Sequence, residues 1–125
     1  MSHINSLKHI GKVALYNKKN DEIIIHGMNL LCLRPNIEIA NPIYLLHALR
    51  SEEFHKKILG ITKPAVNQAS FSTSDLKNLR IPVPSMEDQI KFVCIAEQSD
   101  KSISELRKSV DAIDKVIKSL INENL

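Results

Sequence analysis

The sequence contains no tryptophan, and aromatic residues make up only 4% of its 125 residues. A hydrophobic core must therefore be built mainly from leucine, isoleucine and valine. No apolar run approaches the roughly 20 residues that a membrane-spanning helix needs. The first five residues lack the charged and then apolar pattern of a secretory signal peptide. We therefore expect a cytoplasmic protein, of a length that suits one domain with one appended element.

Cysteine is also scarce, with Cys32 and Cys94 far apart in apolar segments and no Cys-x-x-Cys pair. This pattern favours two buried, reduced thiols over a disulfide or a metal site. The five histidines lack the spacing of metal ligands. The sequence therefore predicts neither a metal site nor a cofactor. The histidines are His3, His9, His26, His47 and His55.

Motifs of catalysis are missing as well. The sequence has no glycine-rich phosphate-binding loop and no nucleophile elbow. It also lacks the Asn-Pro-Pro-aromatic signature of adenine methyltransferases. We therefore expect a protein that is not an enzyme.

The net charge of +3 is distributed unevenly along the chain. Residues 1–82 hold 11 basic and 6 acidic residues, a net charge of +5, whereas residues 83–125 hold 6 and 8, a net charge of −2. The basic part is suited to face phosphate groups. The acidic part is better suited to contact protein or solvent.

The first part of the chain predicts β-structure followed by a helix. Apolar runs at 12–16, 22–26 and 28–34 read as strands that are separated by polar residues and Gly27. Asn41 and Pro42 form a helix start, and apolar residues at helical spacing extend the helix to about Ile58, with Gly60 ending it. Residues 61–70 read as an irregular polar loop.

The second part predicts two more helices. Ser72 and Asp75 form a capping box that opens a short helix. Residues 80–84 are expected to be extended, because each of the two prolines pushes its predecessor out of the helical region. Ser85 and Asp88 form a second capping box, after which neither glycine nor proline interrupts the chain.

The last helix carries a heptad seam. The spacing of its apolar residues alternates between three and four, and β-branched residues occupy every a position. A helix from Met86 to about Ile121 is on the order of 50 Å long. Such a stripe predicts pairing with another helix, in a partner subunit or in a second copy, and the alternative is a helix folded back on its own domain. The seam residues are Ile103, Leu106, Val110, Ile113, Ile117 and Leu120, and the register continues less well backwards through Ala96 and Phe92.

The order of these features resembles the specificity subunits of Type I restriction-modification enzymes. Residues 74–89 read SDLKNLRIPVPSMEDQ, similar to the family's short helix, double-proline strand and Gln-containing helix entry. Residues 11–17 (GKVALYN) and 33–36 (LRPN) resemble two of its strands, and residues 42–62 resemble a helix and a Gly-Thr-Thr loop. The second position of that loop is isoleucine here.

The resemblance implies an α+β fold with a small, mostly antiparallel β-sheet and short helices, followed by a long C-terminal coiled-coil-type helix. Residues 1–84 would form part of a DNA target-recognition domain, with less sequence before the spacer than the family usually has. Residues 85–125 would form the spacer and dimerisation helix. The chain would pair as an antiparallel homodimer and dock modification and restriction subunits, which hold the enzymatic activities.

The resemblance also directs attention to residues for contact with double-stranded DNA. Basic side chains neutralise phosphates, and amide or hydroxyl groups read base edges. A second interpretation is an oligomerisation or regulatory protein that keeps the helix seam and has no DNA affinity. A helix-turn-helix factor is a third, but the sequence has no suitable turn. The expected DNA contacts are Lys12, Tyr16, Lys18 and Lys19 in the first part, and Thr62, Lys63, Asn67, Gln68 and Ser70 in the polar loop.

Overall fold

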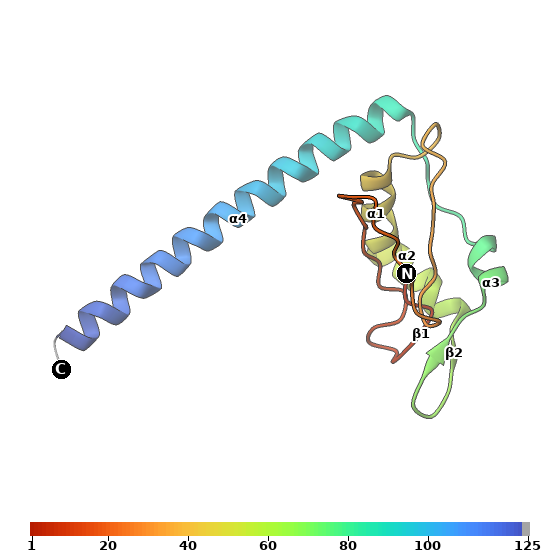
Figure 1. Ribbon diagram of the computed structural model, residues 1–125, viewed down its shortest axis with the longest axis horizontal. Coiled ribbons are helices and arrows are strands. Elements are labelled where there is room, and N and C mark those ends of the chain that lie inside the picture. The colour runs from red at the N-terminus through yellow and green to blue at the C-terminus, as the bar shows by residue number, and fades with distance from the viewer. Residues whose placement is uncertain (124–125) are drawn as a thin grey trace. The chain divides into compact units, whose positions relative to one another are not determined.

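The computed structural model describes residues 1–123, and Figure 1 shows the order of their helices and strands. The chain divides into two compact units, Met1–Gln89 and Ile90–Leu125. Residues 124 and 125, the end of the expected spacer segment 85–125, lie outside the described residues. No helix among the described residues is long and apolar enough to cross a membrane.

A small antiparallel sheet lies in the first unit. It consists of β1 (Ile4–Asn5), β2 (Lys63–Pro64) and β3 (Ala69–Ser70), in the order β1-β3-β2. Ile4 pairs with Ser70 on one side of β3, and Lys63 pairs with Ser70 on the other. The N-terminal segment thus supplies an outer strand, and the expected α+β fold with a small antiparallel sheet is confirmed.

The positions of the predicted strands were wrong. Residues 12–16, 22–26 and 28–34 form no strand, apart from an isolated bridge between Ser2 and Leu30. The reason is the lack of a packing partner, since Ile23 and Ile25 are 90% and 89% exposed. A β-branched run forms a strand only where a neighbouring strand and a core are available.

The predicted irregular loop is instead a hairpin. β2 and β3 are joined by a tight turn in which the Ala65 N–H donates to the Gln68 carbonyl at 2.7 Å. Ala69 and Phe71 alternate with Ser70 and are buried, which anchors this hairpin to the core.

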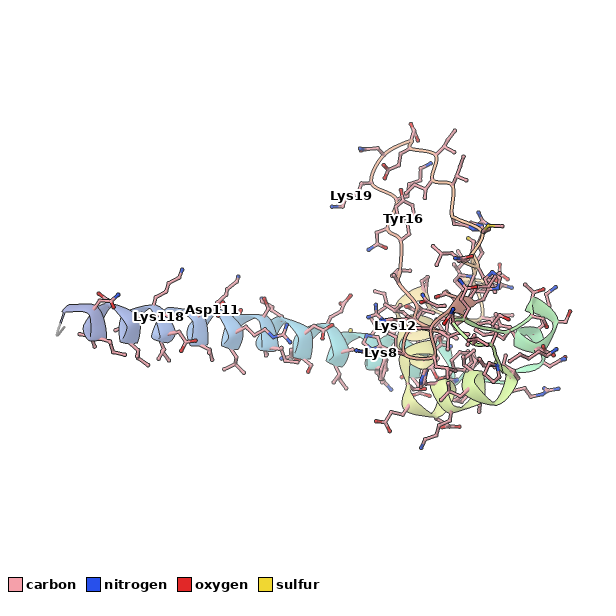
Figure 2. The ribbon with its side chains drawn as sticks, turned by 90° about the horizontal axis from the view of Figure 1, so that it is seen from below. Lys8, Lys12, Tyr16, Lys19, Asp111 and Lys118 are labelled. Atoms are coloured by element: carbon pink, nitrogen blue, oxygen red, sulfur yellow. The ribbon has the colours of Figure 1, made fainter. Side chains whose placement is uncertain are left out.

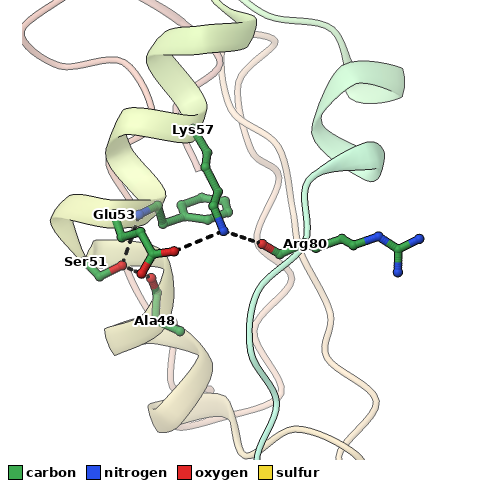
Figure 3. Close-up of polar contacts among 6 residues, drawn as sticks. Ala48, Ser51, Glu53, Lys57 and Arg80 are labelled. Carbon is green, nitrogen blue, oxygen red and sulfur yellow. Dashed lines mark hydrogen bonds and ion pairs between the residues drawn. The ribbon is translucent and has the colours of Figure 1, made fainter.

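The predicted helix of residues 42–58 is two helices, α1 (Pro42–Arg50) and α2 (Glu52–Ile61). Ser51 causes the break, because its extended backbone ends one helix and begins the next. Its hydroxyl donates to the Ala48 carbonyl at 2.8 Å and accepts from the Phe54 N–H at 3.2 Å (Figure 3). Gly60 lies inside α2 and does not end it.

The second helical region agrees with the sequence. The short helix α3 (Thr73–Asn78) has Ser72 as its N-cap, and the Ser72 hydroxyl accepts from the Asp75 N–H at 3.0 Å. The extended segment after it is held by two side chains. Tyr44 donates to the Pro82 carbonyl at 2.9 Å. Lys57 donates to the Arg80 carbonyl, also at 2.9 Å (Figure 3).

The core of the first unit joins residues from three parts of the chain. Ile10, Phe54, Ile58, Ala69 and Phe71 form one buried cluster. Ile58 is 0% exposed and lies on the same face of α2 as Phe54, as their spacing of four residues requires. Partly buried residues surround the cluster: Met1, Leu31, Leu49, Ile61, Leu76, Leu79 and Ile81.

The long helix α4 (Met86–Glu123) begins as predicted. The Ser85 hydroxyl accepts from the Asp88 N–H at 3.2 Å, which forms the expected capping box. The next residue, Gln89, is fully buried. Its amide oxygen accepts from the Asn41 N–H at 2.8 Å, and its amide nitrogen donates to the carbonyls of Ile39 and Pro84, both at 2.9 Å. One side chain thus ties the start of α4 to the start of α1.

The expectation of two buried thiols was wrong. Cys32 and Cys94 are both exposed and free. The apolar segments around them gave the expectation, and those segments are themselves largely exposed within this chain.

Replacing Gly11 with alanine is expected to destabilise the first unit. Gly11 has a φ of +75°, and a Cβ at this position would lie 2.8 Å from Cγ2 of the buried Ile58. Backbone strain and this close contact should together lower the free energy of unfolding by about 1–3 kcal/mol. Chemical denaturation measures this change in the free energy of unfolding. Gly60→Ala is the control, since Gly60 lies in a helix with open space around it and should gain up to about 1 kcal/mol. Equal effects of the two substitutions would refute the argument.

Replacing Gln89 with leucine is expected to lower the free energy of unfolding of the first unit by at least about 2 kcal/mol, because it leaves an N–H and two carbonyls without their partner. The matched control is Gln98→Leu, which changes an exposed glutamine of the same helix and should stay within about 0.5 kcal/mol of the wild type. A Gln89→Leu protein that unfolds at the same denaturant concentration as this control would contradict the assignment.

Candidate nucleic-acid interface and helix-pairing surface

Four of the expected DNA contacts lie on one exposed loop, residues 12–26, here called the arm. Figure 2 shows Lys12 at the base of the arm, with Tyr16 and Lys19 farther out. The backbone holds this base, because the Ser2 N–H donates to the Lys12 carbonyl at 2.9 Å. Arg50 adds a second anchor, since its guanidinium donates to the Val13 carbonyl at 3.1 and 3.3 Å.

Acidic neighbours engage two of these side chains. The Tyr16 hydroxyl donates to Glu22 at 2.5 Å, and this hydrogen bond raises the pKa of Tyr16 above its ordinary value. Lys18 forms an exposed ion pair with Asp21 at 3.8 Å. Such an exposed pair is weak and exchanges readily for a stronger anion. Lys19 makes no comparable contact within the described chain.

The five candidates of the former polar loop lie on or beside the β2–β3 hairpin. Asn67 and Gln68 are exposed at its turn, and within the described chain their side chains make no hydrogen bond. Lys63 is exposed on the outer strand β2. Thr62 is less available, because its hydroxyl donates to the Ile58 carbonyl at 2.7 Å and the residue caps α2. Ser70 is partly buried in the central strand.

The structure links the arm and the hairpin through one segment. The N-terminal residues pair with Lys12 on one side, and Ile4 pairs with Ser70 on the other. The two sets of candidates therefore belong to one folded unit.

Sequence patterns missed two side chains that tie distant parts of the first unit together. Arg50 reaches a carbonyl 37 residues away in sequence, and Gln89 reaches one 50 residues away. Helical periodicity gives no signal for such contacts. For Gln89 a signal existed, because it closes the motif of residues 74–89, but its role required the structure.

The heptad seam of α4 is exposed throughout. Seam residues are 45–66% exposed in the single chain. A shallow groove of about 340 Å³ runs between Ile103, Leu106 and Val110, with Arg107 and Asp111 on its edges. Val116 and Ile121, outside the predicted seam, are 58% and 55% exposed and widen the apolar stripe. The helix surface therefore presents the ridge and hole pattern that a partner helix requires.

The described part of the chain contains no candidate metal site. No group of three or more histidine, cysteine, aspartate or glutamate side chains is close enough to hold an ion.

Comparison with known proteins identifies the family. The family described as "Type I restriction modification DNA specificity domain" matches residues 3–115. The chain belongs to this family. The resemblance found in the sequence is thus confirmed, and the specificity subunits of this family are not catalytic.

One relative of this specificity domain is a type I restriction enzyme MjaX specificity subunit from Methanocaldococcus jannaschii. The two are 42% identical over 122 residues, which cover 98% of this chain and 28% of the relative. The specificity domain thus spans little more than a quarter of that protein. No solved structure matches the chain.

Proposed function

We propose that this chain recognises double-stranded DNA as a specificity component of a Type I restriction-modification system. Membership of the specificity-domain family over residues 3–115 is the observation that carries this proposal. The modification and restriction subunits would bind to it and perform methyl transfer and cleavage. In this assignment residues 1–84 form the recognition part and residues 85–125 the spacer.

The exposed polar groups suit two separate tasks. The arm presents Lys12, Lys18 and Lys19 for phosphate contact, which supplies salt-dependent affinity. The hairpin turn presents Asn67 and Gln68, whose free amides can pair with the donor and acceptor edge of adenine. Phosphate contacts position a protein on DNA, and base contacts give it sequence preference.

The double substitution Lys18→Gln/Lys19→Gln is expected to weaken binding to all duplexes alike. Loss of two phosphate contacts should lower the slope of log affinity against log salt by about 1.8. The control Lys101→Gln/Lys108→Gln removes the same charge from α4 and should leave the slope unchanged.

Asn67→Ala/Gln68→Ala should instead change the sequences selected from a random duplex pool.

A second candidate function is an assembly or regulatory element without DNA affinity. One observation favours it: acidic neighbours already engage Lys18 and Tyr16. The wild-type protein separates the candidates. If it binds no duplex at low salt, alone or with its modification subunit, the DNA-recognition proposal is wrong and the assembly function stands.

The seam supports a homodimer of antiparallel α4 helices. An alignment centred between Asp111 and Ala112 brings every seam residue opposite a seam residue of the second copy, and each layer pairs an a residue with a d residue. The same alignment brings the e position Arg107 opposite Asp114 of the partner subunit, twice by symmetry. The layers pair Ile103 with Leu120, Leu106 with Ile117, and Val110 with Ile113.

Charge reversal tests this alignment. Arg107→Asp should weaken the dimer roughly fivefold, since two attractive pairs become repulsive, and the double variant Arg107→Asp/Asp114→Arg should restore it. In a parallel pair both residues face serines, so the second substitution would not rescue the first. Analytical ultracentrifugation measures the dissociation constant, with helix content from circular dichroism as a control. Ile113→Asp, which places a charge in a central layer, should give monomers; a dimer that survives it would refute the seam.

A further inference from the structure

A shallow cleft of about 430 Å³ lies in the first unit, where the base of the arm meets α1 and α2. Its walls combine three basic side chains, Lys12, Arg50 and His55, with the apolar Val13 and Leu49 and the backbone of Gly11. Among the described residues that line it, none is acidic.

The lysine and arginine keep donors available for a ligand. The Lys12 ammonium lies 2.8 Å from Nδ1 of His9, and because lysine can only donate, this contact uses one of its three N–H groups. Arg50 directs two of its five N–H groups at the Val13 carbonyl. Two ammonium donors and three guanidinium donors therefore remain.

These contacts also fix the positions of the basic groups. The Val13 carbonyl holds the Arg50 guanidinium in one orientation, and His9 holds the Lys12 ammonium. A site whose side chains are already ordered loses less conformational entropy when a ligand binds. Gly11 contributes only its backbone to the cleft, and a Cβ at this position would lie 2.8 Å from the buried Ile58.

The donor set defines the ligand. A guanidinium fork beside a compact ammonium group matches the oxygens of a phosphate, which accept several charged hydrogen bonds at once. The imidazole of His55 also lines the cleft and adds a third nitrogen-bearing side chain. We propose that this cleft is a phosphate-binding site.

The phosphate could belong to a nucleic-acid backbone or be a free ion. The cleft lies at the base of the arm that carries Lys18 and Lys19, which favours a phosphodiester of duplex DNA. That source rests on the function proposed above. It would add Arg50 and His55 to the recognition surface as positioning contacts that carry no sequence information.

Two measurements on the full chain test the site and its ligand separately. The first follows the ring protons of His9 and His55 by NMR while inorganic phosphate is added at constant ionic strength. Saturable chemical-shift changes are expected in the wild type. Lys12→Gln removes one charged contact and should lower the phosphate affinity roughly tenfold. Lys56→Gln, one residue from His55 but outside the cleft, is the matched control and should behave as the wild type.

The second measurement is the salt dependence of duplex binding by the same variants, with thermal unfolding as a check that each is folded. Lys12→Gln should lower the salt slope by about 0.9, and Lys56→Gln should not. Phosphate binding without this slope change would keep the site and reject DNA as its source. Phosphate binding in a protein that binds no duplex would reject the DNA function and keep the site. Identical phosphate titrations of Lys12→Gln and Lys56→Gln would overturn the site itself, even if DNA binds.

Discussion

The hydrogen bonds of Gln89 join parts of the first unit that lie 48 and 50 residues apart in sequence. The amide is fully buried and uses both its oxygen and its nitrogen. Asn41 depends on it directly: its side chain caps α1 by accepting from Ile43 and Tyr44, while its own N–H is satisfied by Gln89. The first turn of α4 therefore completes the cap of α1. A charged, shorter or apolar side chain could not donate to two carbonyls and accept from an amide at once.

From this junction the remaining contacts follow in a chain. The segment before α4 is held by Tyr44 and Lys57, side chains of α1 and α2, at the Pro82 and Arg80 carbonyls. α2 then buries Ile58 against Gly11, and Gly11 precedes the arm. The arm, the hairpin and the start of α4 are thus all held by one small core. The positions of the polar groups on the surface depend on that core more than on local sequence.

Local signals in the sequence predicted the structure well where they were sufficient by themselves. Ser72 and Ser85 cap helices within three residues of their own position, and the seam of α4 is periodic along one element. The predicted strands at 12–16 and 22–26 did not form, because a strand needs a neighbouring strand that a local sequence pattern does not identify. Ser51 was overlooked as a break, although two glutamates follow it as they often follow an N-cap. The nine expected DNA contacts remain predictions: the structure shows which side chains are free, and recognition depends on a ligand.

The arm has a consequence for the protein in solution. Residues 22–26 combine three consecutive isoleucines with backbone groups that no neighbouring strand covers. An exposed β-branched segment of this kind can pair with the same segment of another molecule, which favours aggregation. The charges that precede it, Lys18, Lys19, Asp21 and Glu22, oppose that stacking as gatekeepers do in natural edge strands. Lys18 and Lys19, which we propose as DNA contacts, would thereby also oppose aggregation of the unliganded chain, so their removal bears on yield and shelf life as well as on recognition.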